Sequence, residues 1–131
     1  MVNKGVGLRI YIAAPWVRRF EAIEQAQVLK EAGHRITSRW FEHEGDPVDN
    51  TGGKLDPVEV RRQALEDLDD VRESDVVVVL NFERSEGKAV ETGYALAHHI
   101  PVVQVGPRGS IFACLCKEVE TVEEALEVLR G

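Results

Sequence analysis

The segment Asp75-Val-Val-Val-Val-Leu80 restricts the possible folds of this chain more than any other. After the aspartate it is an unbroken apolar run, mostly β-branched, with no polar alternation. This is the pattern of a strand that is buried on both faces of a parallel sheet. Parallel strands are joined by crossovers that usually contain a helix, so the segment predicts an α/β fold.

The rest of the chain alternates between strand and helix patterns. Strands are predicted at 8–14, 34–41 (the weakest), 75–80, 101–105 and within 111–119. Helices are predicted at 17–32, 57–73 and 86–99, and in a C-terminal segment that turns Val122, Ala125, Leu126 and Leu129 inward. This alternation predicts a doubly wound, Rossmann-like or flavodoxin-like parallel sheet of about five strands. With 131 residues, we expect a single domain over residues 1–131.

Helical spacing also predicts which side chains of the first two helices face the sheet. These are Phe20, Ile23, Ala26 and Leu29 in the first helix, and Val60, Ala64, Leu68 and Val71 in the second. Gly33 is the expected cap after the first helix, and Asp56 followed by Pro57 is a typical start for the second. Residues 42–57 before it have no apolar periodicity, so they form either a disordered loop or a functional lid.

Charge and composition exclude several kinds of partner. The formal net charge is −7, which disfavours extended binding to a nucleic-acid backbone. A small anionic ligand needs only local donors, and the chain offers such candidates: Arg18-Arg19, Arg61-Arg62, Arg84 and Arg108. No stretch approaches the ~20 apolar residues of a membrane span, and the start has no secretory pattern, so the expected location is cytoplasmic. Cys114 and Cys116 are too close together to cross-link the fold and lack partners for a zinc site.

Several common doubly wound proteins do not fit. The glycines near the first strand, Gly5 and Gly7, precede it, so no dinucleotide fingerprint follows that strand. Gly87-Lys88 lacks the spacing of a phosphate-binding Walker loop. A phosphoryl-receiver domain needs an aspartate after the third strand, where this chain has Asn81. The segment 15–20 does not resemble the Ser/Thr-rich loop of a flavodoxin.

Ligands of doubly wound sheets bind outside the carboxyl ends of the strands, which here selects segments 13–19, 81–91 and 105–110. In the second of these, Ser85 is a candidate cap for a helix whose N-terminus favours an anion, and Gly87 allows close approach to its N–H groups. Glu91 lies about one and a half turns into this helix, near enough to face the same crevice. From position alone it is either a catalytic carboxylate or an acid that stabilises the helix start.

Three further candidates have two readings each. Asp67 borders the apolar face of its helix, either as a second site carboxylate or as a surface member of the acidic run 66–70. The hydroxyl of Tyr11 in the first strand points either to the core or to the crevice. Trp16, just after that strand, either stacks on a planar ligand or covers the sheet edge.

Together these segments resemble the nucleoside 2-deoxyribosyltransferase family, which includes transferases and nucleotide N-glycosidases. The matching motifs are Ile10-Tyr-Ile-Ala-Ala-Pro-Trp16, Asp67-Leu-Asp-Asp-Val-Arg-Glu-Ser-Asp75 and, most specifically, Gly87-Lys-Ala-Val-Glu-Thr-Gly-Tyr-Ala95. They cover most of residues 8–105, and the last quarter of the chain matches less clearly.

The resemblance implies a role for each matched residue. Glu91 falls on the catalytic glutamate that forms a covalent glycosyl-enzyme, and Tyr11 on the tyrosine that positions it. Asp67 matches the aspartate that assists the base and the sugar, and Trp16 an aromatic of the base pocket. Ala13, at the end of the first strand, is expected among the substrate-binding residues, with Ser85 and Gly87. The covalent route agrees with the chemistry of retaining glycosidases and needs no metal or cofactor.

One departure from the family pattern affects the expected substrate. Ser85 stands six residues before the glutamate, where the well-known transferases have an aspartate that binds sugar hydroxyls. A hydroxyl beside free helix N–H groups favours a 5′-phosphate that a carboxylate would repel. The hypothesis is therefore hydrolysis of a nucleoside 5′-monophosphate, slightly favoured over base transfer.

Two features stay open on the sequence. By analogy with the family, a homodimer or larger homo-oligomer is expected, in which Arg108 and Ser110 reach a partner's substrate; otherwise 106–110 is only a turn. A catalytically silent nucleotide-binding module of the same fold is the alternative function, and an unrelated doubly wound interaction domain is a third. The retained Tyr11, Asp67 and Glu91 favour an enzyme, because a binding module needs no nucleophile.

Overall fold

The computed structural model describes residues 7–43, 56–107 and 109–130 of the chain. They contain a five-stranded sheet in the order β2-β1-β3-β4-β5, with every neighbouring pair parallel. The strands are β1 (Arg9–Ala13), β2 (Arg35–Ile36), β3 (Val76–Leu80), β4 (Val102–Val105) and β5 (Lys117–Val119). The α-helices are α1 (Arg19–Glu31), α2 (Pro57–Arg72), α3 (Glu86–Ala97) and α4 (Val122–Leu129). Short 3-10 turns are η1 (Trp16–Arg18), η2 (Trp40–Glu42) and η3 (Ile111–Leu115).

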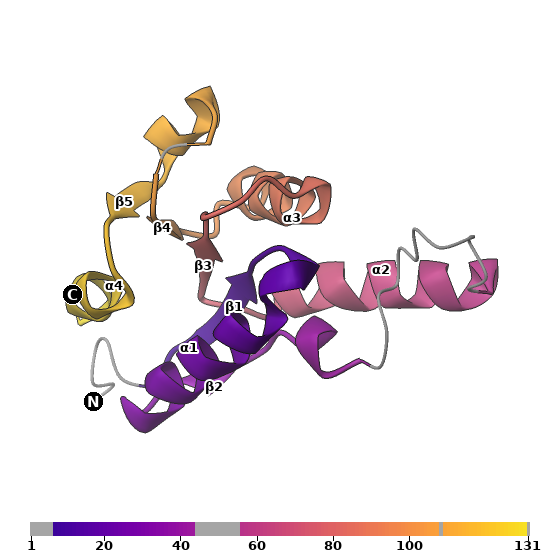
Figure 1. Ribbon diagram of the computed structural model, residues 1–131, viewed down its shortest axis with the longest axis horizontal. Helices are drawn as coiled ribbons and strands as arrows, with labels where there is room; N and C mark the ends of the chain where they lie inside the picture. The colour runs from indigo at the N-terminus through magenta and orange to yellow at the C-terminus, as the bar shows by residue number, and fades with distance from the viewer. Residues whose placement is uncertain (1–6, 44–55, 108, 131) are drawn as a thin grey trace.

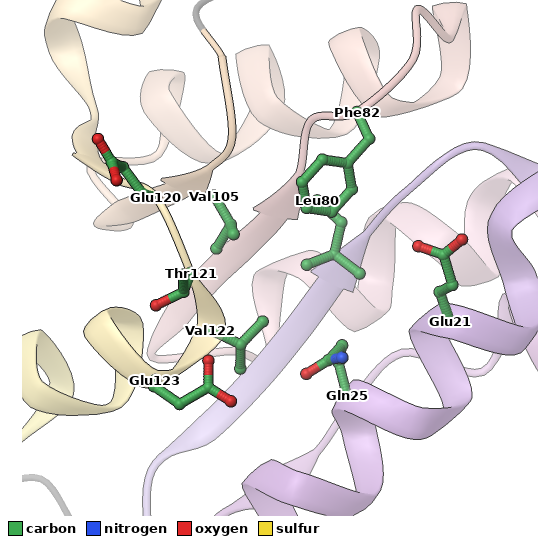
Figure 2. Close-up of a pocket in the computed structure, with 9 residues that line it drawn as sticks. All are labelled: Glu21, Gln25, Leu80, Phe82, Val105, Glu120, Thr121, Val122 and Glu123. Atoms are coloured by element: carbon green, nitrogen blue, oxygen red, sulfur yellow. The ribbon is translucent and has the colours of Figure 1, made fainter.

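Helices cover both faces of the sheet, which confirms the predicted doubly wound α/β fold. In Figure 1, α2 and α3 lie on one side of the sheet and α4 on the other. Figure 2 shows α1, which carries Glu21, and α4, which carries Glu123, in front of the same sheet face. The strand order is that of the flavodoxin-like variant, so its topological switch point lies between β1 and β3.

The valine run forms the centre of the sheet, as its composition predicts. All five residues of β3 are buried, and β3 pairs with β1 on one side and β4 on the other. In this register Tyr11 lies beside Val77 and Ala13 beside Val79. Because side chains alternate along a strand, Tyr11 and Ala13 share one face while Ile10 and Ile12 face the other.

The predicted strand at 34–41 is wrong over most of its length, because only Arg35–Ile36 is extended in the sheet. Beyond Ile36, side chains rather than a strand backbone form hydrogen bonds with the backbone of the neighbouring strand β1. The Ser38 hydroxyl accepts from the Ile12 N–H at 3.1 Å, and the Trp40 indole donates to the Ile12 carbonyl at 2.7 Å. These bonds satisfy the edge of β1 without a longer β2, so the chain turns into η2.

The predicted inward face of the first helix is also partly wrong. Its buried residues are Ala22, Ala26 and Leu29, whereas Phe20 is 66% exposed and Ile23 41%. Phe20 precedes Ala22 by two positions, or about 200° around a helix, so both cannot face the sheet. The Phe20 ring instead lies under the Arg19 guanidinium, 4.6 Å from the ring centroid.

Helix α2 begins as predicted, because Asp56 caps it and Oδ1 accepts from the Val58 N–H at 2.9 Å. Its apolar face is only partly covered. Val71 is fully buried, but Ala64 is exposed. Figure 1 shows the reason: the first half of α2 extends beyond the sheet. Of the predicted loop 42–57, residues 44–55 lie outside the described residues.

The last quarter of the chain follows the prediction with small shifts. Helix α3 ends at Ala97 rather than His99, and the last strand is confined to Lys117–Val119. Residues Ile111–Leu115 before it form the 3-10 turn η3. Within the described parts of the chain, no helix has both the length and the apolar character of a membrane span.

Candidate active site

The candidate site centres on a hydrogen bond between two buried side chains from different elements. Tyr11, in the middle of β1, is fully buried, and its hydroxyl donates to Oε2 of Glu91. Glu91 lies in the second turn of α3 and is 8% exposed. β1 borders β3 at the switch point, and α3 covers the face to which Tyr11 points, so the fold itself brings the two side chains together. The sequence left open whether the Tyr11 hydroxyl points to the core or to the crevice; in the structure it points to Glu91.

The surroundings of Glu91 hold its carboxyl in the neutral form at neutral pH. Burial raises the pKa of Glu91 to about 8; the Tyr11 hydrogen bond opposes this and the charge of Asp67 adds to it. Burial also raises the pKa of Tyr11 well above 10, with the nearby Glu91 charge as the second cause. Perturbed carboxyl groups of this kind concentrate at functional sites because burial and charge pairs are what tune a nucleophile or a general acid.

Asp67 joins this cluster from α2. Burial raises its pKa to about 6, against the effect of the nearby His43 charge. Its Oδ1 atom is buried and has no hydrogen-bond partner among the described residues. A buried carboxylate oxygen without a donor is costly, so a bound ligand or water that donates to it would be stabilised there.

An aromatic cluster lies at the end of β1. The Trp16 and Trp40 ring centroids are 6.3 Å apart, and Trp40 makes an edge contact with Phe41 at 5.2 Å. The Arg19 guanidinium covers the Trp16 ring, with 4.8 Å to the centroid. Trp16 is partly exposed, whereas Trp40 is buried. This packing is compatible with a Trp16 ring that stacks on a planar ligand and with one that only covers the sheet edge.

The loop after β3 presents the predicted helix cap. Ser85 is the N-cap of α3, and its Oγ accepts from the Lys88 N–H at 3.2 Å. Gly87 is exposed, and a Cβ added there would meet nothing closer than the Ser85 hydroxyl at 3.9 Å. The start of α3 is therefore open to a ligand on this side.

The structure gives less support for the remaining predicted substrate contacts, Ala13, Ser110 and Arg108. Ala13 is fully buried, so neither its side chain nor its backbone is exposed to a ligand in this structure. Ser110 caps η3, where its Oγ accepts from the Phe112 N–H at 3.2 Å, and it is exposed. Arg108 lies outside the described residues.

Sequence reasoning missed several polar contacts near the site. The buried ammonium of Lys88 donates to Asn81 Oδ1 and to the Glu83 carbonyl. The buried Asp70 carboxylate accepts from the Arg39 guanidinium at 2.7 Å. The sequence does indicate that Asp70 lies near the site, because Asp70 is one helical turn after Asp67 on the same face of the helix. The bond between Lys88 and Asn81 joins residues seven positions apart across a loop, and no sequence periodicity predicts such a contact.

The surface of the described chain has two hollows near these elements. One of about 200 Å³ is lined by Arg39, Glu42, His43 and Glu66, next to Asp67 in sequence. The other, of about 250 Å³, lies between α1 and α4 over the ends of β3 and β4. Figure 2 shows its lining, with Glu21, Glu120 and Glu123 around Leu80 and Val105. The second hollow opens on the sheet face opposite to Glu91, so it is separate from the carboxyl site.

No group of three or more metal-binding side chains occurs in the part of the chain that the structure describes.

The fold and the buried Tyr11–Glu91 pair define a flavodoxin-like α/β protein with a carboxyl site at its switch point. The sequence profile of the family described as nucleoside 2-deoxyribosyltransferase matches residues 10–123. The chain belongs to this family, which confirms the resemblance seen in its motifs and excludes an unrelated interaction domain. The family is one of enzymes that act on small nucleoside substrates.

Solved structures share the fold at low identity. The CMP N-glycosidase BcmB of Clostridium botulinum matches with a TM-score of 0.54 and 14% identity, over 92% of this chain and 97% of that one. A conserved protein from Enterococcus faecalis V583 matches with a TM-score of 0.57 and 19% identity, over 95% and 98%. No curated protein matches the chain significantly in sequence.

Proposed function

We propose that this protein cleaves the N-glycosidic bond of a nucleoside or nucleoside 5′-monophosphate through a covalent glycosyl-Glu91 intermediate. The observation that carries the proposal is the buried Tyr11–Glu91 hydrogen bond. A purely structural glutamate would not be expected in an enclosed position beside a second carboxyl, because burial penalises its charge. As a nucleophile, the same carboxylate is compensated by the positive charge that develops on the sugar.

The reaction proceeds in two steps. A Glu91 carboxylate oxygen forms a bond to the anomeric carbon as the bond from that carbon to the base nitrogen breaks, and the bonding electrons leave with the base. Asp67, whose buried Oδ1 has no hydrogen-bond partner among the described residues, would accept a hydrogen bond from the base or the sugar, and the departing base would take its proton from water. Water then attacks the anomeric carbon and frees Glu91, or a second base does so and gives transfer.

Tyr11 acts on the nucleophile rather than on the substrate in this scheme. Its hydroxyl donates to one oxygen of Glu91, which fixes the rotation of the carboxyl group and favours its charged form. The other oxygen remains available for the anomeric carbon. A fixed orientation of this kind removes an entropic part of the barrier.

The proposed preference for a 5′-monophosphate rests on the start of α3. Ser85 offers a hydroxyl and the first helix turn offers N–H groups, and Gly87 leaves space beside them. A phosphate bound there would be stabilised by the helix N-terminus. That a structural neighbour is a CMP N-glycosidase supports including this nucleotide among the candidate substrates.

The site is also proposed to be completed by a second copy of the chain. Ser110 is exposed and begins a segment whose apolar side chains are uncovered in the single chain: Ile111, Phe112 and Leu115. Such a cluster is typical of an interface. Light scattering tests this directly, since a fully active monomer would contradict a shared site.

The central test is chromatographic detection of released base. Ribo- and deoxynucleosides and their 5′-monophosphates are incubated with wild type and Glu91→Ala, each with and without a second free base. Glu24→Ala, at an exposed position of α1, is the control. We expect release from monophosphates, lost only in Glu91→Ala.

Other outcomes change the conclusion in defined ways. A new nucleoside formed only with the second base would show a transferase. Binding of a nucleotide without any product would favour a catalytically silent binding module. Ser85→Asp should lower the preference for the phosphorylated substrate, and an unchanged preference would refute the proposal that Ser85 favours a 5′-phosphate.

A further inference from the structure

Lys88 is a buried cation that the chemistry above does not use. It lies in the first turn of α3 and is only 6% exposed. Long side chains of a helix point back toward its N-terminus, so the Lys88 ammonium lies beneath the loop that leads from β3 into α3. There it donates to Asn81 Oδ1 and to the Glu83 carbonyl.

These bonds tie together the loops at the carboxyl ends of three strands. Asn81 links the loop after β3 to the turn after β4, because its Nδ2 donates to the Pro107 carbonyl at 2.5 Å. The Glu83 side chain forms an ion pair at 2.7 Å with Arg18, which follows β1. Lys88 is thus at the centre of a network that links the loops at the carboxyl edge of the sheet.

The charge of Lys88 is not neutralised by a direct ion pair. Both of its acceptors are neutral oxygens, and no carboxylate of the described residues lies within ion-pair distance of it. Burial lowers the pKa of Lys88, and the nearby Glu83 charge opposes this effect. A desolvated ammonium with neutral partners favours an anion close by, since electrostatic attraction is stronger where water is excluded.

We propose that Lys88 is a positioning residue that selects phosphorylated substrates. It fixes the loop 81–85 against the turn after β4, and it places a positive charge beneath the α3 N-terminus where a 5′-phosphate would bind. The inference rests on the proposed cleavage of nucleotides, and it adds a determinant within the chain for choosing the monophosphate over the nucleoside.

The test compares two substrates on matched variants. Lys88→Met removes the charge and keeps an apolar stem, Lys88→Arg keeps the charge, and Lys30→Met removes the same charge from an exposed position on α1. The measured quantity is the ratio of kcat/KM for a nucleoside 5′-monophosphate to that for the matching nucleoside.

We expect Lys88→Met to lower this ratio about tenfold, mainly through KM of the monophosphate, because a desolvated positive charge near the phosphate is lost. Lys88→Arg should restore most of it, and Lys30→Met should leave it unchanged. An equal loss on both substrates would show a merely structural lysine and overturn the proposal, as would no change. If Lys88→Met does not fold by circular dichroism, Lys88→Gln serves as the neutral variant.

A binding measurement separates this inference from the proposed function. Ribose 5-phosphate and ribose are titrated into each protein and followed by the fluorescence of Trp16 and Trp40. Selective binding of the phosphate by wild type, lost in Lys88→Met, would support the role of Lys88 even if no base is ever released. Base release with an unchanged substrate ratio would leave the proposed function intact and overturn the role of Lys88. No binding of ribose 5-phosphate to wild type would also overturn it.

Discussion

Replacing Glu91 by glutamine should make the protein more stable, and the gain should grow as the pH rises. Glutamine has nearly the shape of glutamic acid and keeps an oxygen that can accept from the Tyr11 hydroxyl. What it removes is an acid that ionises easily in the unfolded chain but not in the folded protein. The variant therefore isolates the free-energy cost of burying this one carboxyl group.

The size of the effect follows from the pKa of Glu91, about 8 in the folded protein against its ordinary value of 4.5. Between these two values the folded protein holds a proton that the unfolded chain has lost, so the stability of wild type falls as the pH rises. The cost is about 1.4 kcal/mol for each pH unit in this window. The stability gap between variant and wild type should therefore widen by about 3 kcal/mol between about pH 5 and about pH 7.5.

Urea unfolding of both proteins across this pH range measures the gap, provided the slope with denaturant is the same in both. The side chain at position 91 is mostly uncharged in the folded state of both wild type and the glutamine variant over this window, so the titration of Asp67 largely cancels in the difference. Glu86→Gln is the matched control, because its carboxyl is exposed in the same helix. A gap that stays constant or narrows with pH would show that Glu91 is ionised in the folded protein, and the proposed cause of its raised pKa would be wrong.

Three further results are expected. The kcat/KM of wild type for base release should rise about tenfold per pH unit and level off above about 8, because the ionised form of Glu91 is the nucleophile; a profile that is flat from pH 6 to 9 would contradict this. Tyr11→Phe should lower kcat about ten- to a hundredfold in the same assay and move the inflection to higher pH, since it removes a bond to the charged carboxylate. Gly109→Ala should lower the free energy of unfolding by about 1 kcal/mol in urea, because its Cβ would lie 2.8 Å from the Asn81 amide nitrogen. Gly87→Ala is the control, with no atom closer than 3.9 Å, and equal effects of the two would refute the steric explanation.

The sequence predicts the parts of the fold that depend on local patterns. An apolar run with no polar alternation can be satisfied only by burial on both faces, so Val76–Leu80 is found at the sheet centre. The rule that ligands bind at the carboxyl ends of parallel strands selected the loops that contain Trp16 and Ser85. Strand order was not predicted, because it depends on which buried faces fit together after the elements form.

The errors in the fold come from bonds between distant residues. Nothing near residues 34–41 shows that Ser38 and Trp40 will bond to the backbone of Ile12 and end β2 early. For the first helix, the stripe containing Phe20 and the one containing Ala22 both have helical spacing. Only the packing of small alanines against the sheet decides between them.

The candidate site divides in the same way. Tyr11, Asp67 and Glu91 were selected by motif, and the structure joins the first and last by a hydrogen bond. Lys88 has no role of its own on the sequence, because it occurs there only within a failed phosphate-loop pattern and within the third family motif. Its burial depends on Asn81 and on the loop between them, which no local propensity encodes.

The cost of burying Glu91 and its usefulness as a nucleophile have one physical origin. A carboxylate that burial destabilises in the free protein regains that free energy when a positively charged centre takes the place of water beside it. The anomeric carbon acquires such a charge as the base departs, so the transition state is stabilised more than the bound substrate. The unfolding and rate experiments should then report the same pKa for Glu91. If stability and kcat/KM change at clearly different pH values, the burial of Glu91 is a feature of the fold and not the source of its reactivity.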